Sequence, residues 1–575
     1  MTTSLQNLNL TCQNQKVPWL FNHRVIGKAF LFLSLFWMVG GGLLALAVRW
    51  QLAWPWEEVP VLGSTLFTST GGKMPQEFYT MLFTMHATVM LFLVVIPLLT
   101  GAFGNLLIPP MIGTDRMYSP KLCFWHFALM WPGYLAFTLS FFSPGYGPSS
   151  GWTAYAPLAT FAGAAPGSGQ AQTLWLIGIV FVSLSSLAGS INTIATIFQR
   201  RTKELTMFRL PMTIWCLLIA AIIQLFGLPV LLAGGTMQIL DRSVGTTFFQ
   251  PQSLVIAQEV FSNGGGDPLA WQHLFWFYSH PAVYVMILPV MGMISEILSC
   301  FARKPLFGYR GMIISVCSIA IMGFLVWGHH MFVSGMNQAL GATFALSTML
   351  IAIPSALKTF NWLGTLWRAN IQFTTAMLFS ISFVFMFLIG GLSGIFMASP
   401  AVDTYIHDSY FIVAHIHYVL FGSSIMGVFG AFHYWFPSFF GKTLNETLGK
   451  IHFVMTFLFL NGTFFLMHLL GIAGMPRRTA DPYHLELFRP LLPMNQWITL
   501  FAILLTTAQL IFVINFFYTL FFGKKSPPNP WRANTLEWQN LSDCGTVGRT
   551  VFHAPYRFNH SNDKLDYCPQ NQESN

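Results

Sequence analysis

Long apolar runs alternate with short polar stretches along almost the whole chain. A helix needs roughly 20 apolar residues to cross a bilayer, and twelve runs approach or exceed that length. Connectors rich in Gly and Pro, such as 143–148 and 264–268, separate them. We therefore predict an all-α integral membrane protein, a bundle of about twelve transmembrane helices. The expected spans are about 26–49, 79–107, 122–142, 173–198, 207–236, 270–300, 309–331, 339–359, 372–396, 409–437, 450–473 and 493–522.

The polar stretches are too short to build a soluble domain. We predict an N-terminal tail at 1–24, one membrane domain at 25–522 and a C-terminal tail at 523–575. The 575-residue chain is 54% hydrophobic and only 8% charged, whereas soluble domains carry about 25% charged residues. Loop 143–172 has no charged residue, so we expect it to pack on the protein or on a partner subunit.

Basic residues cluster in alternate loops. The net charge of +9 could suggest nucleic acid binding, but the distribution follows the positive-inside pattern of membrane proteins. It places both tails in the cytoplasm and favours a multi-pass protein of a prokaryotic inner membrane, surrounded by lipid, without a nucleic-acid partner. The clustered basic residues are Lys16, Arg24, Lys28, Arg116, Lys121, Arg200, Arg201, Lys203, Arg209, Arg303, Lys304, Arg310, Lys442, Lys450, Lys524 and Lys525.

Six histidines lie in or at the edge of these apolar runs. An ionisable ring there is costly unless it has a partner, and imidazole is the commonest metal ligand. We therefore predict a set of metal centres. Nitrogen-rich sites suit copper, zinc or iron rather than magnesium or calcium, and the seven cysteines lack metal-type spacing. The six histidines are His86, His280, His329, His330, His415 and His417.

The spacing of these histidines predicts how they are shared. His415 and His417 point about 200° apart on a helix, so they suit two centres flanking one helix. His280 and Tyr284 lie on one face, where a tyrosine can supply a proton and an electron to a metal-bound imidazole. Adjacent His329 and His330 converge on one ion if the helix end is distorted. Ordinary polar contacts and an interfacial tyrosine remain the alternatives.

Six short motifs carry a resemblance to a known family. They are Trp271-Gln-His-Leu-Phe-Trp276, His280-Pro-Ala-Val-Tyr284, Trp327-Gly-His-His-Met-Phe-Val-Ser-Gly-Met336, His407-Asp-Ser-Tyr410, Ala414-His-Ile-His-Tyr418 and Gly474-Met-Pro-Arg-Arg478. Together they resemble subunit I of the haem-copper oxygen reductases, the cytochrome c and quinol oxidases. The resemblance covers about residues 20–540.

The resemblance implies two haems of the A type and one copper, copper B. His86 and His417 would ligate the low-spin haem, and His415 the high-spin haem. Copper B would lie opposite the high-spin haem. Its ligands would be His280, His329 and His330, with Tyr284 covalently linked to His280 in similar proteins.

Arginines and a polar pair would surround these groups. Arg477 and Arg478 resemble the partners of haem propionates, which suits a side chain that binds carboxylates bidentately. Arg49 resembles the residue that hydrogen-bonds the formyl group of haem A, although a snorkelling arginine looks the same. His407 and Asp408, with Asp403 beside them, resemble ligands of a magnesium completed by a second subunit.

The implied activity is the four-electron reduction of oxygen to water, coupled to proton translocation in a terminal respiratory oxidase. The expected donor is cytochrome c, acting through subunit II with its dinuclear copper; subunit III is a further expected partner. A quinol oxidase is the alternative, but Leu43-Leu44-Ala45, Phe78 and Met81 leave the quinol region mostly apolar. Tyr284 argues against a nitric oxide reductase.

A multi-span proton-coupled transporter with histidine relays is the alternative from another class. Twelve spans alone would favour it. It does not account for His415 with His417, or for the adjacent His329 and His330.

Protons for oxygen reduction must cross the inner half of the membrane. Lys358 is a charge near the inner end of an apolar run, with Ser355 one turn away and Ser295 three turns below Tyr284. These residues match the K-channel of the family, which leads to the tyrosine. A lysine that snorkels to the interface is the alternative.

A second proton path departs from the family pattern at several positions. Most members carry a glutamate where this chain has Ala282; Tyr278 and Ser279 resemble a subgroup in which a Tyr-Ser pair replaces it. Arg116 aligns with the usual entrance aspartate, and Asp115 lies one residue early. The asparagine usual near Leu122-Cys123 is missing. The residues that fit the lower channel are Asn105, Ser185, Ser186 and Asn192.

Overall fold

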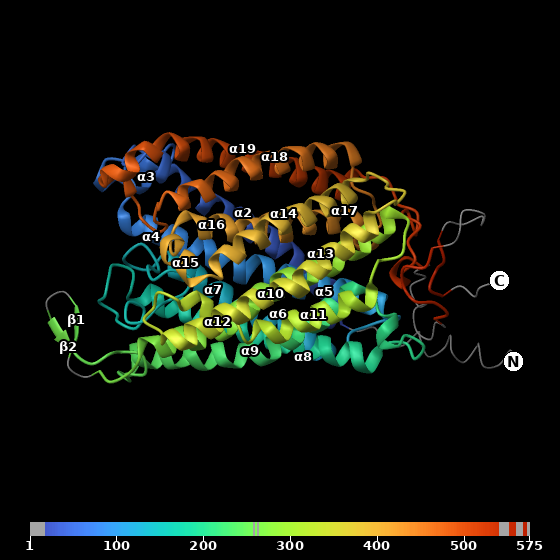
Figure 1. The fold of residues 1–575 in the computed structure, drawn as a ribbon, viewed down its shortest axis with the longest axis horizontal. Helices are drawn as coiled ribbons and strands as arrows, with labels where there is room; N and C mark the ends of the chain where they lie inside the picture. The colour runs from blue at the N-terminus through green and yellow to red at the C-terminus, as the bar shows by residue number, and fades with distance from the viewer. Residues whose placement is uncertain (1–17, 257–258, 262–263, 540–550, 559–566, 572–575) are drawn as a thin grey trace.

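The helices lie side by side along one direction and form a single bundle (Figure 1). This computed structural model describes residues 18–256, 259–261, 264–539, 551–558 and 567–571. One two-stranded hairpin projects from an end of the bundle, where β1 (Leu254–Ile256) pairs antiparallel with β2 (Glu259–Phe261). The predicted all-α membrane fold is confirmed.

Eleven helices in the described residues are long and apolar enough to cross a membrane. Several are built from consecutive segments. They are α2 (His23–Ala53); α4 (Gln76–Thr88) with η3 (Val89–Val95), η4 (Pro97–Phe103) and α5 (Gly104–Met111); α6 (Pro120–Ala128) with α7 (Met130–Phe141); α8 (Gln170–Arg200); α9 (Met212–Ser243); α10 (Pro268–Ala302); α12 (Gln338–Leu350) with α13 (Ala352–Leu366); α14 (Thr375–Met397); α16 (Tyr410–His417) with η7 (Tyr418–Ile425) and α17 (Met426–Phe440); α18 (Glu446–Ile472); and η9 (Glu486–Leu491) with α19 (Leu492–Phe522).

The predicted span 309–331 has a different form from the other eleven. Its regular helix, α11 (Tyr309–Gly323), has only 15 residues. A break follows, and then the 3₁₀ helix η6 (Trp327–Met331). A Cβ at Gly328 would lie 2.1 Å from the Phe344 ring of α12, so η6 is pressed against a neighbouring helix. The helix end that carries His329 and His330 is thus distorted, as their adjacency required.

Short elements fill the connections between the spans. They are η1 (Trp19–Phe21), α3 (Gly63–Leu66), η2 (Thr68–Thr70), η5 (Met207–Arg209), α15 (Pro400–Ile406), η8 (Pro482–His484) and η10 (Leu536–Trp538).

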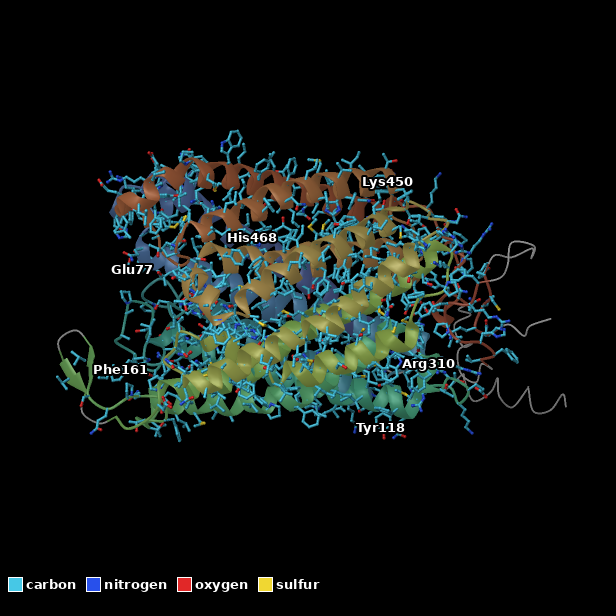
Figure 2. The ribbon with its side chains drawn as sticks, in the orientation of Figure 1. Glu77, Tyr118, Phe161, Arg310, Lys450 and His468 are labelled. Atoms are coloured by element: carbon cyan, nitrogen blue, oxygen red, sulfur yellow. The ribbon has the colours of Figure 1, made fainter. Side chains whose placement is uncertain are left out.

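The connections rich in Lys and Arg gather at one end of the bundle, called the basic end below. Figure 2 shows Tyr118, Arg310 and Lys450 toward this end and Glu77 and Phe161 toward the other. The segment η1 contacts α6, and η10 contacts α5, so both ends of the described membrane domain lie here. The charge pattern predicted an even number of crossings; eleven helices of the described residues meet the length and hydropathy of a span, and the predicted span 309–331 contains only the shorter helix Tyr309–Gly323.

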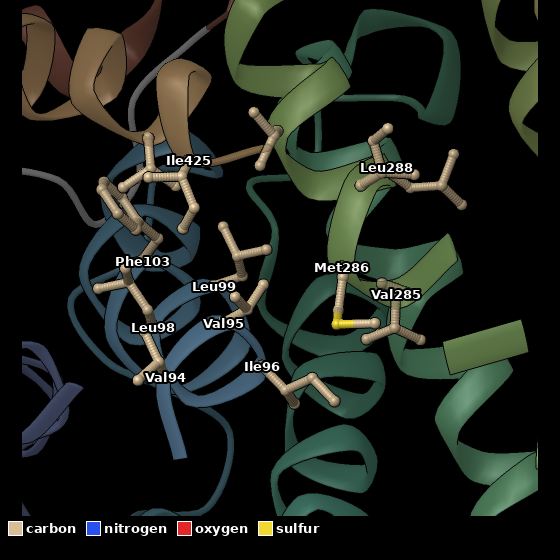
Figure 3. Close-up of a cluster of buried hydrophobic side chains, with 14 of the residues drawn as sticks. Val94, Val95, Ile96, Leu98, Leu99, Phe103, Val285, Met286, Leu288 and Ile425 are labelled. Atoms are coloured by element: carbon tan, nitrogen blue, oxygen red, sulfur yellow. The ribbon is translucent and has the colours of Figure 1, made fainter. Parts of the chain in front are cut away.

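Helix α10 forms the centre of the bundle. Its most apolar 18-residue window is entirely buried, whereas the corresponding window of α2 is 17% buried. A helix that is apolar all round belongs in the core or in lipid, and neighbouring helices decide between the two. Figure 3 shows Val95 of η3, Leu99 of η4 and the intervening Ile96 beside Val285 and Met286 of α10.

The winding of two helices changes directly beside predicted ligands. The π-helical segment η3 starts three residues after His86, and η7 starts immediately after His417. Such wide turns occur mostly as short insertions, frequently at functional sites. Each wide turn rotates the side chains on its C-terminal side about the helix axis relative to those on its N-terminal side.

The uncharged loop 143–172 packs on the protein, as predicted. Arg242 of α9 donates to the carbonyl oxygens of Ala159, Ser168 and Gly169. Trp271 of α10 donates to the Thr153 carbonyl at 3.0 Å. The loop thereby closes the bundle at the end opposite the basic end.

Close packing of α9 on α10 depends on Gly292. A Cβ there would lie 2.7 Å from Thr213 Cα and 2.8 Å from Met212 O, both in the backbone of α9. We expect Gly292→Ala to lower the free energy of unfolding by about 1–3 kcal/mol, since overpacking forces the backbone apart. Gly391→Ala in α14 is the control, because nothing lies within 4 Å of its added Cβ. Thermal unfolding of the detergent-purified protein gives the comparison, and equal midpoints would contradict this view of the interface.

Candidate metal centre

Three histidines from two elements converge in the middle of the bundle. His280 comes from α10, and His329 and His330 come from η6. One nitrogen of each ring lies within 4.8 Å of the others, and in the described residues this is the one group of at least three His, Cys, Asp or Glu that could hold a metal. His280 Nδ1 and His329 Nε2 each lie 3.1 Å from His330 Nε2.

Hydrogen bonding determines which nitrogen of His329 faces this cluster. Its Nδ1 lies 3.0 Å from Thr348 Oγ1, and that hydroxyl donates to the Phe344 carbonyl at 2.6 Å. The Thr348 oxygen can therefore only accept, so Nδ1 carries the proton and Nε2 keeps its lone pair. A lone pair facing another imidazole nitrogen at 3.1 Å needs a proton or a metal between them. Three imidazole nitrogens suit copper, zinc or iron, so the residues fit the implied copper.

Tyr284 packs against the same cluster. The rings of Tyr284 and His280 have centroids 4.9 Å apart and an interplanar angle of 71°, as their spacing of four residues predicted. His280 Nε2 is buried and lacks a hydrogen-bond partner among the described residues, because Nδ1 faces the other histidines. Trp276 stacks on His330, with ring centroids 3.8 Å apart. The cluster is therefore held rigidly by aromatic rings.

His86 and His417 face each other across a second site. Their rings are parallel within 6° and their centroids are 6.2 Å apart. His86 Nδ1 lies 2.8 Å from Gly41 O, and His417 Nδ1 lies 2.7 Å from Val413 O. A carbonyl only accepts, so both Nδ1 atoms carry protons and both Nε2 atoms keep lone pairs. The two free nitrogens are suited to hold the iron of one haem.

His415 points away from His417, as the 200° separation predicted. Its Nδ1 lies 3.0 Å from Ser393 Oγ on α14, and that hydroxyl donates to Gly390 O at 2.9 Å. Nε2 is again left to bind a metal. His329 lies within electrostatic reach of His415, so the His415 site adjoins the three-histidine cluster. A Cβ at Gly394 would lie 3.1 Å from the His415 ring.

Two arginines flank these sites near the end opposite the basic end. Arg477 pairs with Asp408 through Nη2–Oδ1 at 2.6 Å and donates from Nε to the same oxygen at 2.7 Å. Burial opposes ionisation of Asp408, but the charges of Arg477 and Arg478 outweigh it and lower its pKa. Burial, with the neighbouring Arg477, lowers the pKa of Arg478 to about 10. Arg478 thus stays charged at neutral pH, and among the described residues it has no carboxylate within 4.0 Å.

Arg49 is buried between α2 and α19 rather than extended to the membrane surface. Its Nη2 donates to Asn495 Oδ1 at 2.7 Å and to Asn495 O at 2.9 Å. Its Nη1 is buried and has no acceptor within the described chain. An unsatisfied buried donor is costly, so this atom is suited to an acceptor on a bound group. The geometry disfavours the snorkelling alternative.

The predicted magnesium ligands lie close together but have other partners here. His407 Nδ1 lies 3.0 Å from Asp403 Oδ2, and Asp408 pairs with Arg477. Asp403 is thus the carboxylate nearest to His407. The magnesium assignment remains a prediction.

Lys358 is completely buried in α13. Its Nζ lies 2.9 Å from Met291 Sδ and 5.6 Å from the Trp362 ring centroid. Trp362 Nε1 donates to Ser295 Oγ at 2.9 Å. Ser355 instead donates back to Ile351 O of its own helix. A snorkelling lysine keeps its ammonium in water, so the complete burial of Lys358 against the Met291 thioether disfavours that alternative.

The four residues assigned to the lower second path lie along α5 and α8. Asn105 and Asn192 are buried and are joined by Cys123, whose Sγ lies 3.5 Å from Asn105 Oδ1 and 3.0 Å from Asn192 Nδ2. Ser185 donates to His126 O, and Ser186 O accepts from Ser190. Cys123 therefore lies between the two amides. The sequence indicated only that the usual asparagine near Leu122-Cys123 is missing.

Asp115 lies in a hollow of about 530 Å³ at the basic end. Its carboxylate is 3.8 Å from Arg200 Nη1 and 4.0 Å from Arg116 Nε. The hollow is also lined by Tyr118 and Lys203. The acid is present at this end, but cations surround it.

Tyr278 and Ser279 lie where α10 faces the segment η3. Ser279, Ala282 and Trp152 line a cavity of about 10 Å³, close to the smallest that holds one water. Ser279 Oγ is buried and lacks a partner among the described residues. Tyr278 is 1% exposed and packs on Gly227 of α9.

Several supporting residues were missed from the sequence. Thr348 and Ser393 orient His329 and His415, and Cys123 joins the two asparagines. A threonine or serine that bonds its own helix gives no signal in the sequence of a second role toward another helix. Only the packing of helices far apart in the chain reveals it.

Comparison with known proteins decides the family. Residues 25–504 match the family described as cytochrome c and quinol oxidase polypeptide I. The chain belongs to this family. It is therefore a multi-pass oxidase subunit, the catalytic one, that holds haem and copper and associates with other oxidase subunits in a respiratory chain. Family membership excludes the transporter alternative.

Relatives extend over almost the full chain. Cytochrome c oxidase subunit 1 of Synechocystis sp. is 41% identical over 540 residues, covering 93% of this chain and 91% of the relative. The alternative cytochrome c oxidase subunit 1 of Bradyrhizobium diazoefficiens is 38% identical, covering 92% and 89%. A solved haem-copper terminal oxidase dimer shares the fold with a TM-score of 0.69, at 18% identity over 88% of this chain and 84% of its own.

Thr348 offers a test of the metal cluster that leaves its ligands intact. We expect Thr348→Val to weaken copper binding by about 10–100-fold, because the partner of a ligating histidine orients the ring. Thr343→Val, on the same helix, is the control, since its exposed hydroxyl bonds only Ala339 O. Copper content after equilibration with a graded chelator, measured by elemental analysis, gives the affinity. Equal retention in both variants would refute the orienting role of Thr348.

Proposed function

We propose that this subunit reduces oxygen to water with the residues that the family resemblance assigned. Copper B would be held by His280, His329 and His330, beside a high-spin haem on His415. A low-spin haem would lie between His86 and His417. The observation that carries the proposal is the convergence of three imidazole nitrogens within 4.8 Å, with Tyr284 against His280 and His415 close by.

When bound, the haems and copper would provide the metal centre at which oxygen is reduced and would carry electrons to it from the donor. The chain supplies protons and orientation. Tyr284 packs on a ligating imidazole, where a phenol can release a proton and an electron toward the centre. Its presence favours oxygen over nitric oxide as the substrate. The Nδ1 bonds of His86, His329, His415 and His417 keep their other nitrogens unprotonated for metal binding.

Charged side chains around the haems would bind the polar substituents of the haem rings. Arg478 has a guanidinium free of carboxylate partners within the described residues, and with Arg477 it is suited to haem propionates. The orphan Nη1 of Arg49 is suited to a formyl oxygen, which would make the haems A-type. His407 and Asp408, or Asp403 in place of Asp408, would bind magnesium with a ligand from a second subunit.

The partners and location follow from the relatives and from the charge pattern. Many relatives are named cytochrome c oxidase subunit 1, which favours cytochrome c as donor over quinol, and the apolar stretch Leu43-Leu44-Ala45 agrees. Delivery would use subunit II with its dinuclear copper, and subunit III would complete the complex. The basic end would face the cytoplasm of a prokaryote across its inner membrane.

Protons would reach Tyr284 along α10 and α13. Ser295, Trp362 and Lys358 form one contiguous contact, and Ser355 lies one turn from the lysine. An amine can accept and release a proton, so Lys358 can pass protons along such a path. We assign the protons consumed at the metal centre during its reduction to this path.

The second path would start near Asp115 and pass Asn105, Asn192, Ser185 and Ser186. It would end at the water-sized cavity beside Ser279 and Tyr278, in place of a glutamate at Ala282. A water there would satisfy the orphan Ser279 hydroxyl. The thiol of Cys123 is a weak donor and acceptor, so proton passage between the two asparagines would rely on water.

The two haem sites can be separated by substitution. His417→Ala should remove the low-spin haem and its absorption bands while the high-spin haem remains, because the two haems would be held by different histidines. His415→Ala should do the reverse, each variant retaining one haem of two. His468→Gln is the control, a buried histidine of α18 without a proposed ligand role (Figure 2). Loss of the same bands in all three variants would disprove these assignments.

Lys358 can be tested through the rate of reduction of the metal centre. Lys358→Met should slow that reduction by about 10²-fold or more, the range expected for loss of a positioned acid–base group. Lys450→Met, at the exposed surface of the basic end, is the control and should react normally. Stopped-flow absorption of the purified complex after addition of reductant measures both rates. An unchanged rate in Lys358→Met would remove this path from the proposal.

A further inference from the structure

A buried carboxyl lies next to Ser295 in α10, and none of the assigned roles uses it. Glu296 is 3% exposed. Its Oε1 accepts from Tyr556 OH at 2.6 Å, from Thr213 N at 3.2 Å and from Thr213 Oγ1 at 3.4 Å. These donors converge on one oxygen. Since a carboxylate has two, the other oxygen is left for proton transfer.

Glu296 adjoins the Lys358 path. Its neighbour Ser295 accepts from Trp362, on which Lys358 packs. The charges of Glu296 and Lys358 both reach the thiol of Cys216 in α9. Since α10 rises about 1.5 Å per residue, Glu296 lies one residue nearer the basic end than Ser295. Ser295 faces Trp362 of α13, whereas Glu296 faces Thr213 of α9, so the Cys216 thiol of α9 is the neighbour that Glu296 and Lys358 share.

The chain's own C-terminal segment covers this carboxyl. Tyr556 belongs to the described stretch 551–558, and its hydroxyl oxygen also accepts from Met212 N at 2.8 Å. The stretch is anchored by Arg209, which donates to Val551 O at 3.2 Å, and the Tyr556 ring packs on Tyr309. Tyr556 thus joins the first turn of α9 to the C-terminal part of α10.

A second buried carboxyl lies in the same region. Glu537 of η10 is 1% exposed and acts electrostatically on Glu296. Burial raises the pKa of Glu537 from 4.5 to about 7, against hydrogen bonds that lower it. The titratable groups that act on Glu296 or are acted on by it are Tyr556, Tyr309, Glu537, Cys216, Cys300 and Tyr434, with Lys358 and Arg303 beyond the two thiols.

We propose that Glu296 is the proton-uptake group of the Lys358 path and that segment 551–558 covers it through Tyr556. In each cycle Glu296 gives one proton toward Lys358 and regains one from water at the basic end. No electrons move in this step, and the carboxyl returns to its starting state. The inference rests on the proposed function of Lys358.

A purely structural role is the competing explanation. A carboxylate near the first turn of a helix stabilises it, and Glu296 accepts from Thr213 in the first turn of α9. Glu446 offers a matched case, because its Oε2 accepts from Thr375 N at 2.9 Å and from Thr375 Oγ1 at 2.8 Å in the first turn of α14. Glu446 has the same helix-end role without Lys358 nearby.

The decisive experiment compares Glu296→Gln with Glu446→Gln in the purified holoenzyme complex. Stopped-flow reduction of the metal centre should slow about tenfold in Glu296→Gln. A positioned acid–base group typically contributes about 10²–10⁴-fold, and the expected effect is smaller because water can bypass the missing carboxyl. Glu446→Gln should react normally. Reduction-induced infrared difference spectra should lose a carboxyl band in Glu296→Gln and keep it in the control.

Lys358→Met, measured alongside, separates the two proposals. If Lys358→Met slows reduction and Glu296→Gln behaves like Glu446→Gln, the uptake role is wrong and the Lys358 path stands. If Lys358→Met reduces at the normal rate, the path fails and the uptake role fails with it.

Tyr556→Phe keeps the test open should Glu296→Gln not fold. The phenol donates to Glu296 and stabilises the carboxylate, so its loss keeps Glu296 protonated to higher pH. Only protonated Glu296 can give a proton, so the reduction rate should fall as the pH rises. In Tyr556→Phe this fall should occur at higher pH. An unchanged pH profile in Tyr556→Phe would overturn the covering role of the C-terminal segment.

Discussion

The site depends on one constraint, the need of each buried imidazole to satisfy its own N–H. In the described structure, His86 and His417 meet backbone carbonyls, and His415 and His329 meet hydroxyls that already donate elsewhere. Each contact assigns the proton to Nδ1 and leaves Nε2 for a metal. The acceptors for His86, His329 and His415 come from α2, α12 and α14. Metal binding therefore depends on how these helices pack, as well as on the ligands.

The central helix α10 carries residues of both the metal cluster and the proposed proton path. His280, Tyr284, Ser295 and Glu296 lie along it in order, from the metal cluster toward the basic end. Its surroundings are close-packed, with Gly292 against α9 and apolar side chains of the segments η3 and η4 on another face. A helix buried on all sides can hold several polar groups in register, because neighbours on every side restrict their rotamers.

Acidic groups are distributed unevenly along the predicted proton routes. The middle of the bundle has Ala282, which carries no ionisable group, and Cys123 lies between two asparagines. The buried carboxyls Glu296 and Glu537 instead lie near the basic end, beneath the C-terminal segment. Ionisable groups cost less near the membrane surface than at its centre. This arrangement places the carboxyls near water and leaves hydroxyls and a lysine in the interior.

The sequence alone determined the membrane class, the positions of the spans and the candidate metal ligands, because hydrophobic runs and helical spacing are local properties. It also predicted that His415 and His417 diverge and that His280 and Tyr284 share a face. Helix packing decided what the sequence could not. It ended α11 early and wound His329 and His330 into a 3₁₀ turn. It brought Thr348 and Ser393 to their histidines, placed Cys123 between Asn105 and Asn192, and laid Tyr556 on Glu296. These contacts join residues from separate helices, and an apolar pattern records only that a helix is buried, not which partner it meets.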